Sequence, residues 1–360
     1  MSTPAVLLLI FRRPELARRQ IGALRLVQPR RIYVAADGPR PDRPMDNVAC
    51  AAARRALEGI DWPCQVKTLF RTTNLGVKLA VSQAIDWFFE SEEAGVILEE
   101  DCLPHPDFFW FCESLLDRYR NDIRVMQISG TNFQPLVRTQ ERSFFFSRYS
   151  HVWGWATLRR AWRLYRANLE GLESFLEEAT ENHFWENRRE QKYWRKILQI
   201  AKADRVQSWA YRWTYTLWAE GGLCVYPEVN LVTNLGFGDG ATNTQKTDRL
   251  KAGRGLHPLL KLIHPSTVMR CRDADLWTFE HLYWGEPLAR AWHHLERLGE
   301  LVSGFVERVT TRTNSALTGV FGRFRTKRDL PLAPVAPASA YTRPRRSTSR
   351  LFEPRQRLRR

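Results

Sequence analysis

Three consecutive acidic residues, Glu99, Glu100 and Asp101, follow a short apolar run and are the side chains in this sequence best suited to chemistry. Adjacent carboxylates can bind a divalent cation, and a bound cation can neutralise the charge of a diphosphate. Acidic residues that follow a strand can equally form a solvated turn that binds no ligand. Position alone leaves both interpretations open, so the neighbouring strand ends have to be considered together with the triplet.

Two other polar sites follow apolar runs in the same way. Arg12 and Arg13 come after the run that ends at Phe11, and Asp37 comes after Ile32–Ala36. A guanidinium group pairs well with phosphate, and a carboxylate accepts hydrogen bonds from a ribose or a base. Ligands of open parallel sheets bind beyond the carboxyl ends of the strands. Because polar or charged side chains suited to a nucleotide diphosphate follow three of the predicted strands, the sequence indicates a binding site for such a ligand at this edge of the sheet.

The runs before these residues must be neighbouring strands, and the first 130 residues have the pattern of such a sheet. Val6–Phe11 is continuously apolar, which is typical of a strand buried on both faces. Strands are expected there and at Ile32–Ala36, Gln65–Phe70, Gly95–Leu98 and Arg124–Ile128, and helices are expected at Pro14–Val27, Asp46–Leu57, Gly76–Phe89 and Pro106–Tyr119. This alternation predicts an α/β fold with a Rossmann-like, mostly parallel sheet flanked by helices.

The composition fits a folded protein that does not span a membrane. The chain has 360 residues, of which 44% are hydrophobic and 26% are charged, enough for a sizeable core. Its apolar N-terminal run, Ala5–Phe11, is far shorter than the roughly 20 residues that a spanning helix needs, and no signal peptide is expected. The six cysteines include no C-x-x-C pair, which predicts reduced, mostly buried thiols and a cytoplasmic location.

Most of the net charge of +16 lies at the end of the chain. Residues 301–360 contribute +11 and the remainder only +5, so a nucleic-acid partner is the weaker interpretation of the charge. Residues 285–309 are expected to form an amphipathic helix, and the Pro- and Arg-rich residues 330–360 are expected to be disordered. Together they would suit peripheral binding to an anionic membrane at its inner face. The helix could instead pack on the folded domain and leave only the tail free.

Several longer strings, in order along residues 4–280, carry a resemblance to a known family. They are LLLIFRRP, IYVAADGPR, NLGVKLAVSQAIDWFF, GVILEEDCLPHPDFF, RVMQISGTNF, FSRYSHVWGWATLRRAW and NLVTNLGFGDGATNT. They resemble a bacterial family of nucleotide-diphospho-sugar transferases with the GT-A glycosyltransferase fold, distantly similar to the N-acetylglucosaminyltransferase I group. The resemblance implies a GT-A-like domain at residues 1–280, and the pattern of the chain beyond it predicts a helical basic extension at 281–329 and a disordered tail at 330–360.

The resemblance also implies roles for individual residues. Asp101 matches the aspartate that binds the metal, usually Mn²⁺ and alternatively Mg²⁺, and Glu100 matches the residue that contacts the ribose. Asp37 matches the residue that binds the uracil base, and Arg13 matches the arginine that reaches the nucleotide. Trp155, in a Gly-Trp pair, matches a residue that lines the pocket between donor and acceptor. Most other tryptophans are expected to pack in the core, with Trp209 and Trp213 as further pocket candidates.

Two departures from the family pattern affect the expected mechanism. The family usually has an aspartate, the expected general base, where this chain has Ala210, and a histidine where it has Asn243. An asparagine does not replace an imidazole as a metal ligand of similar strength. No catalytic residue is therefore assigned, although Asp239 could serve as another carboxylate.

The resemblance and the residues together predict a metal-dependent glycosyltransferase. It would move a sugar from a nucleotide-diphosphate donor, with a UDP-sugar expected, to a glycan or lipid-linked acceptor. A degenerate protein that binds a nucleotide sugar or glycan without turnover is the alternative that Ala210 and Asn243 favour. A basic nucleic-acid-binding protein is the third interpretation. The donor sugar, the acceptor, the stereochemical outcome and the oligomeric state are left open by the sequence.

Overall fold

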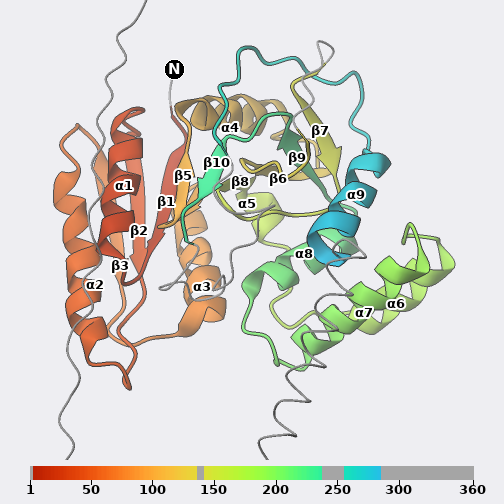
Figure 1. Ribbon diagram of the computed structural model, residues 1–360, viewed down its shortest axis with the longest axis horizontal. Coiled ribbons are helices and arrows are strands. Elements are labelled where there is room, and N and C mark those ends of the chain that lie inside the picture. The colour runs from red at the N-terminus through yellow and green to blue at the C-terminus, as the bar shows by residue number, and fades with distance from the viewer. Residues whose placement is uncertain (1–2, 136–141, 237–254, 285–360) are drawn as a thin grey trace, which may run out of the picture. The chain divides into compact units, whose positions relative to one another are not determined.

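The structure is a computed structural model that describes residues 3–135, 142–236 and 255–284 (Figure 1). All of them lie in the first of the two units into which the chain divides, Met1–Ala291. The expected extension from residue 285 onward and the basic tail lie outside the described residues. The described part contains no helix that is long and apolar enough to cross a membrane.

An eight-stranded sheet forms the centre of the unit, in the order β3-β2-β1-β4-β8-β6-β9-β7. Strands β3, β2, β1, β4, β6 and β9 run in the same direction, and β8 and β7 run against them. The prediction of a mostly parallel sheet is confirmed, and the two antiparallel strands are an addition to it. The strands are β1 (Ala5–Ile10), β2 (Arg31–Ala36), β3 (Gln65–Phe70), β4 (Ala94–Glu99), β6 (Val125–Ser129), β7 (Phe144–Ser147), β8 (Trp155–Leu158) and β9 (Leu223–Pro227).

Strand β1 shows why apolar runs form the middle of the sheet. It pairs in parallel with β2 on one side and β4 on the other, and all six of its residues are buried. Successive side chains point to opposite faces, so both faces need apolar residues. Val6, Leu8 and Ile10 belong to one hydrophobic core, and Leu7 and Leu9 belong to another on the opposite face.

Helices cover both faces, as the alternating pattern predicts. The first core contains buried side chains from α1, α2, η1 and α4, which are Pro14–Arg25, Met45–Arg55, Ala56–Gly59 and Pro106–Arg118. The second core contains side chains from α3 (Gly76–Ser91), α5 (Arg159–Trp162), α6 (Leu172–Glu181), α7 (Arg188–Lys202) and α8 (Trp209–Ala219). Helices α6, α7 and α8 lie together on one side of the molecule, followed in the chain order by β9 (Figure 1).

A second, two-stranded sheet fixes the acidic triplet. Strand β5 (Cys102–Pro104) pairs with β10 (Val232–Asn234), so Glu99 ends β4 and Glu100-Asp101 forms the turn between β4 and β5. The chain then returns near this region through α9 (Arg272–Thr278) and the π-helix η2 (Phe279–Trp284). The triplet is thus held between two sheets and is not a free surface loop.

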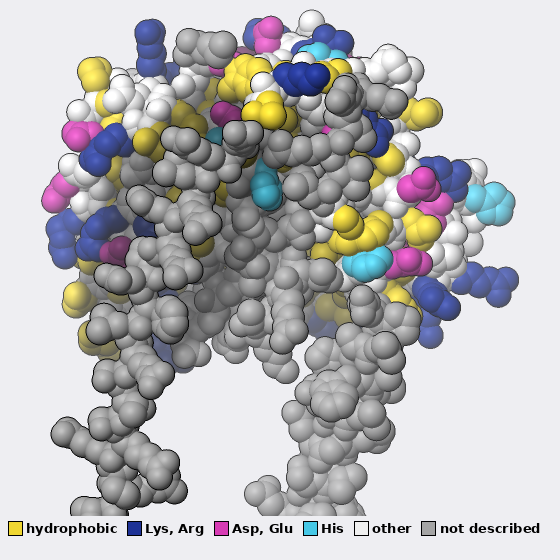
Figure 2. Space-filling view, turned by 45° about the horizontal axis from the view of Figure 1, so that its top comes forward, with side chains coloured by type: hydrophobic (Ala, Val, Ile, Leu, Met, Phe, Trp, Pro, Cys, Tyr) yellow, Lys and Arg dark blue, Asp and Glu magenta, His cyan; other side chains and the backbone are white. Residues whose placement is uncertain are grey.

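Two further expectations concern the surface and the cysteines. All six cysteines are free thiols, and Cys50, Cys102, Cys112 and Cys224 are buried, as expected. On the face seen in Figure 2, the described Lys and Arg side chains are spread among Asp and Glu side chains and do not gather into one basic patch. The tail on which the nucleic-acid and membrane interpretations depend lies outside the described residues.

Candidate functional site

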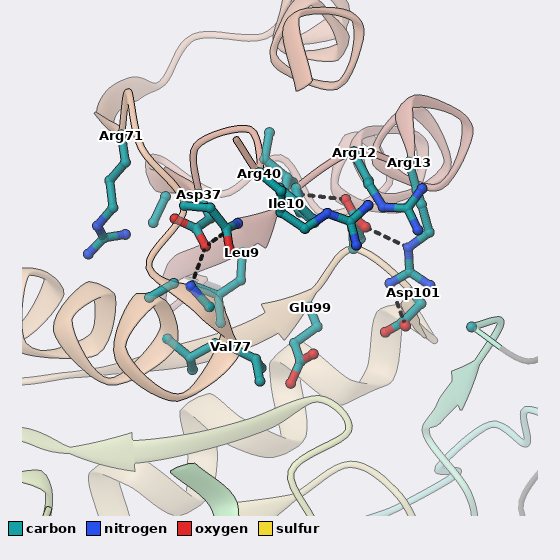
Figure 3. A pocket seen from close by; sticks show the side chains of 18 of the residues that line it. Leu9, Ile10, Arg12, Arg13, Asp37, Arg40, Arg71, Val77, Glu99 and Asp101 are labelled. Carbon is teal, nitrogen blue, oxygen red and sulfur yellow. Dashed lines mark hydrogen bonds and ion pairs between the residues drawn. The ribbon is translucent and has the colours of Figure 1, made fainter. Parts of the chain in front are cut away.

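A cavity of about 230 Å³ lies at the carboxyl ends of β1, β2, β3 and β4. We call it the charged cavity, because Arg12, Arg13, Arg40 and Arg71 line it together with Asp37 and the triplet Glu99–Asp101 (Figure 3). The side chains come from four separate strand ends that share one edge of the sheet. This arrangement is the one that the sequence predicted for Arg13, Asp37, Glu100 and Asp101.

Arg13 joins two members of the triplet. Its Nε lies 2.6 Å from Glu100 Oε1 and its Nη2 lies 2.7 Å from Asp101 Oδ2. Burial alone would lower the pKa of Arg13, but the adjacent carboxylates of Asp101 and Glu100 outweigh burial and raise its pKa. The guanidinium therefore stays charged and orders the turn after β1 against the turn after β4.

Glu100 is held within the protein more than the sequence indicates. It is 5% exposed, and its Oε2 accepts a hydrogen bond of 2.8 Å from the backbone N–H of Phe11. Burial raises the pKa of Glu100, while its ion pair with Arg13 opposes that rise. In this arrangement both oxygens of Glu100 are engaged by the β1–α1 turn, so the side chain positions Arg13 as well as lining the cavity.

Asp101 is surrounded by backbone from a distant segment. The backbone oxygen of Asp101 accepts a hydrogen bond of 2.7 Å from the backbone N–H of Leu235. Its carboxylate Oδ1 accepts a hydrogen bond of 3.4 Å from the side-chain amide of Asn234. A Cβ on Gly236 would stand 2.1 Å from Asp101 Oδ2, so only glycine allows the chain to pass this closely. The carboxylate is therefore enclosed by β10 and the residues that follow it.

Glu99 differs from its two neighbours in having no bonded partner. Its side chain is half-buried and makes no hydrogen bond or ion pair with any residue of the described ranges. Burial, and secondarily the negative charge of Asp101, raises the pKa of Glu99 to about 8. Figure 3 shows it apart from the Arg13 cluster, on the opposite side of the cavity from Arg40.

Asp37 lines the cavity but also holds the start of α3. Its carboxylate accepts hydrogen bonds from the backbone N–H groups of Gly38, Leu75 and Gly76 and from the Asn74 amide, at 2.9 to 3.2 Å. A carboxylate at a helix N-terminus is stabilised by the unpaired N–H groups there. The expected contact with a nucleobase remains a prediction, and the structure gives Asp37 this structural role in addition.

Two arginines of the charged cavity, Arg40 and Arg71, have no counterpart among the predicted site residues, whereas Arg12 was predicted beside Arg13. Arg12 has no ion pair within the described part of the chain, Arg40 pairs with Asp46 at 2.6 Å, and burial lowers the pKa of Arg71. Arg71 follows β3 directly, so the rule that selected the ends of β1, β2 and β4 would also have found it. Arg40 lies in the loop after β2, and the path of this loop brings its side chain to the charged cavity.

The described residues form no complete set of metal ligands: no group of three or more His, Cys, Asp and Glu side chains is placed to hold a metal among residues 3–135, 142–236 and 255–284. Among the acidic residues that line the charged cavity, Glu99 and Asp101 interact, since the charge of Asp101 contributes to the raised pKa of Glu99. Mg²⁺ and similar ions are commonly bound by one or two carboxylates plus substrate phosphates.

A second, larger cavity of about 710 Å³ adjoins the first. We call it the aromatic cavity, because the rings of Phe133, His151, Trp153, Tyr193, Trp209, Tyr211 and Tyr283 line it. Val77, Glu99 and Trp153 line both cavities. Ala210 is also in the wall of the aromatic cavity, at the first turn of α8.

The structure places Trp155 away from both cavities. It is 1% exposed, and its ring stacks on Trp209 at a centroid distance of 5.7 Å. Trp153, two residues earlier, is the tryptophan of this segment that lines both cavities. Trp213 is fully buried as well, and its indole N–H donates to Gln127 Oε1 at 2.7 Å. The expected pocket role of Trp155 therefore has no support in this geometry, because the ring is used in the core.

Other candidates have different places. Lys78, near the start of α3, lies 2.5 Å from Asp204 Oδ1 and does not line the charged cavity. Gly236 lines the charged cavity, whereas Asp239 and Asn243 lie outside the described residues.

Comparisons with known proteins add little to this geometry. No protein-family model matches the chain, and no curated protein matches its sequence. The crystal structure of HddC from Yersinia pseudotuberculosis aligns with a TM-score of 0.27 and 12% identity, over 44% of this chain and 77% of that chain. The structure of the same protein complexed with GMP-PN gives a TM-score of 0.26 and 11% identity, over 43% and 77%. Structural similarity this low gives no information about the function of this chain.

Proposed function

We propose that the protein is a glycosyltransferase that moves a sugar from a nucleotide-diphosphate donor, a UDP-sugar in our proposal, to an acceptor hydroxyl. The observation that carries this proposal is the convergence of four arginines, Asp37 and the triplet Glu99–Asp101 on one cavity. A diphosphate needs cationic partners, and nucleotides bind beyond the carboxyl ends of parallel strands. The resemblance of residues 4–280 to nucleotide-diphospho-sugar transferases with the GT-A fold agrees with this proposal.

The arginines would act on the departing diphosphate. In the transfer, the acceptor oxygen forms a bond to the anomeric carbon, and the bond from that carbon to the diphosphate oxygen breaks with its electron pair. Arg12 and Arg13 line the charged cavity where the developing negative charge would be stabilised. Arg13 is already ordered by Glu100 and Asp101, so little reorganisation is needed when the donor binds.

Asp101 would hold the divalent cation, with Glu99 facing the same space. When bound, Mn²⁺ or Mg²⁺ would neutralise the diphosphate. Arg13 pairs with Asp101 Oδ2, so its guanidinium would lie beside both the cation site and the diphosphate. Glu100 would keep Arg13 beside the site throughout, because both Glu100 oxygens remain engaged.

A binding protein without turnover is the second candidate, and Ala210 favours it. Ala210 lines the aromatic cavity at the position where the resemblance implies the base that takes the acceptor proton. A methyl group takes no proton, so transfer would require another acceptor for it. Release of UDP from a UDP-sugar, with and without acceptor glycans, separates a transferase from a binding protein.

The location that we propose is the cytoplasm. All six cysteines are free, which fits a reducing compartment. Attachment to an anionic membrane through the basic tail, at residues 330–360, and a lipid-linked acceptor remain part of the proposal for the full chain.

A thermal-shift screen of nucleotides and nucleotide sugars, with and without Mn²⁺, tests the proposed function. UDP and a UDP-sugar should raise the midpoint of unfolding in Mn²⁺ more than they do in EDTA, because a ligand that binds only the folded state stabilises it. A screen in which no nucleoside diphosphate changes the midpoint would contradict the proposal.

A further inference from the structure

We infer that the aromatic cavity binds the uncharged sugar ring at the end of an acceptor glycan. The role of this sugar as the acceptor rests on the proposed function, whereas the binding of an uncharged sugar rests on the cavity itself. Ligand cavities usually combine apolar walls with a few placed polar groups, and their volumes are commonly about 300–1,000 Å³. The aromatic cavity, at about 710 Å³, has this size and this kind of wall.

Its aromatic rings form a continuous wall. The centroids of Trp153 and Phe133 are 5.3 Å apart, those of Phe133 and His151 are 4.7 Å apart, and those of His151 and Tyr283 are 6.5 Å apart. Tyr283 in turn lies 6.1 Å from Tyr193. A pyranose ring carries C–H groups on its faces and hydroxyls at its edge, so it can pack on such rings while its hydroxyls bond to polar groups.

The tyrosines supply those polar groups. The phenol hydroxyls of Tyr193, Tyr211 and Tyr283 have no hydrogen-bond partner among the described residues, and none of the three oxygens is fully buried. Burial raises the pKa of Tyr193 and of Tyr211, so both hydroxyls remain protonated and can donate. All three rings are partly exposed at the edge of the second hydrophobic core, and all three line the aromatic cavity.

The charge of the wall selects against acidic sugars. Among residues 3–135, 142–236 and 255–284, no Lys or Arg lines the aromatic cavity, and Glu99 is the single Asp or Glu in its wall. A carboxylate or sulfate in this cavity would lose its hydration without gaining a cation. The charged cavity next to it is lined by four arginines, so anionic and neutral ligand groups are separated between the two spaces.

The two cavities adjoin at Glu99, Val77 and Trp153, which line both. A sugar stacked on Trp153 in the aromatic cavity would therefore lie beside the donor in the charged cavity. This contiguity is the reason for assigning the acceptor, and not a distant glycan, to the aromatic cavity.

A glycan microarray with the full chain and two variants tests the inference. Ala210→Trp places a large ring into the aromatic cavity without touching the charged cavity, since Ala210 lines only the former. Ala203→Trp adds the same ring at an exposed site that lines neither cavity and is the matched control. UDP binding in Mn²⁺, measured by calorimetry on all three proteins, reports on the charged cavity and on folding.

The expected result is that neutral glycans are retained in preference to uronate-, sialate- or sulfate-terminated ones. Ala210→Trp should lower that retention at least tenfold, with Ala203→Trp and all three UDP affinities unchanged. The inference would be overturned if the full chain retained acidic glycans in preference to neutral ones or retained no glycan at all. It would also be overturned if Ala210→Trp and Ala203→Trp retained neutral glycans equally. If UDP binds to none of the proteins while the glycan pattern holds, the proposed function fails and the sugar cavity stands.

Discussion

The two adjoining cavities differ in almost every property that governs binding. Arginine and acidic side chains line the charged cavity, whereas seven aromatic rings and one carboxylate line the aromatic cavity. Charged groups fix a polyanion by ion pairs, and aromatic rings fix a neutral ring by contact area. The comparison indicates that the two cavities suit different ligand groups, charged groups in one and uncharged rings in the other.

The cavities are also assembled in different ways. The charged cavity is built from turns that follow strands of the parallel sheet, and its side chains are fixed by ion pairs such as Arg13 with Glu100. The aromatic cavity takes its rings from loops and from α7, α8 and η2. Its rings are fixed mainly by packing, because Tyr193, Tyr211 and Tyr283 lie against the second hydrophobic core.

The largest expected effect comes from adding a carboxylate to the aromatic cavity. Ala210→Asp places one at the position where the resemblance implies a base, so UDP release from a UDP-sugar should rise above that of the parent protein. General-base assistance typically contributes about 10²–10⁴-fold. An active parent whose rate is unchanged by this substitution would mean that the proton leaves by another route. Ala203→Asp, at an exposed position, controls for the added charge.

Removal of an ion pair from the charged cavity should have the next largest effect, on stability. Arg13→Gln leaves the nearly buried Glu100 without its cation, which should lower the free energy of unfolding by about 3 kcal/mol. Arg12→Gln should cost less than about 0.5 kcal/mol, because Arg12 has no ion pair within the described part of the chain. Urea unfolding of the two variants measures the difference. Equal losses of stability would show that the Arg13 pairs do not order the site.

The smallest expected effect concerns Glu99, where the two cavities meet. Its pKa is about 8 in the metal-free fold against 4.5 for a free glutamate, so the native state keeps this proton longer than the unfolded chain. The free energy of unfolding should therefore fall as the pH rises from about 4.5 to about 8. Glu99→Gln removes this contribution and should raise the midpoint of unfolding at pH 8.5 in EDTA relative to the parent. A similar rise of the unfolding midpoint at pH 4, or in the exposed control variant Glu90→Gln, would show that the rise does not come from the Glu99 proton.

Much of the sheet and of the charged cavity could be predicted from the sequence. Apolar runs and helix-start signals are local, so β1, β3 and α4 lie within one or two residues of their expected bounds. The carboxyl ends of parallel strands meet at one edge, and this brought Arg13 and Asp101 together although they are 88 residues apart. The antiparallel strands β7 and β8 could not be predicted, because strand direction depends on pairing partners and not on local pattern.

The aromatic cavity could not be predicted, and the reason is physical. Trp153 and Trp155 stand in the same short segment, yet one lines both cavities and the other is buried. In an extended chain, residues i and i+2 point to the same side, but Gly154 stands between residues 153 and 155 with a φ of +66°, which breaks the extended pattern. Tyr193 and Tyr283 come from helices 90 residues apart in the chain, and only tertiary packing brings their rings together.

The central claim is that the charged cavity binds a nucleoside diphosphate through Asp101 and a divalent cation, and calorimetric titration of UDP tests it most directly. The wild-type chain and Asp101→Asn should be titrated in Mn²⁺ and in EDTA, with unfolding midpoints to confirm that both are folded. The account predicts that Mn²⁺ strengthens UDP binding at least tenfold in the wild type and has no such effect in Asp101→Asn. Equal UDP affinity of the two proteins in Mn²⁺ would contradict it.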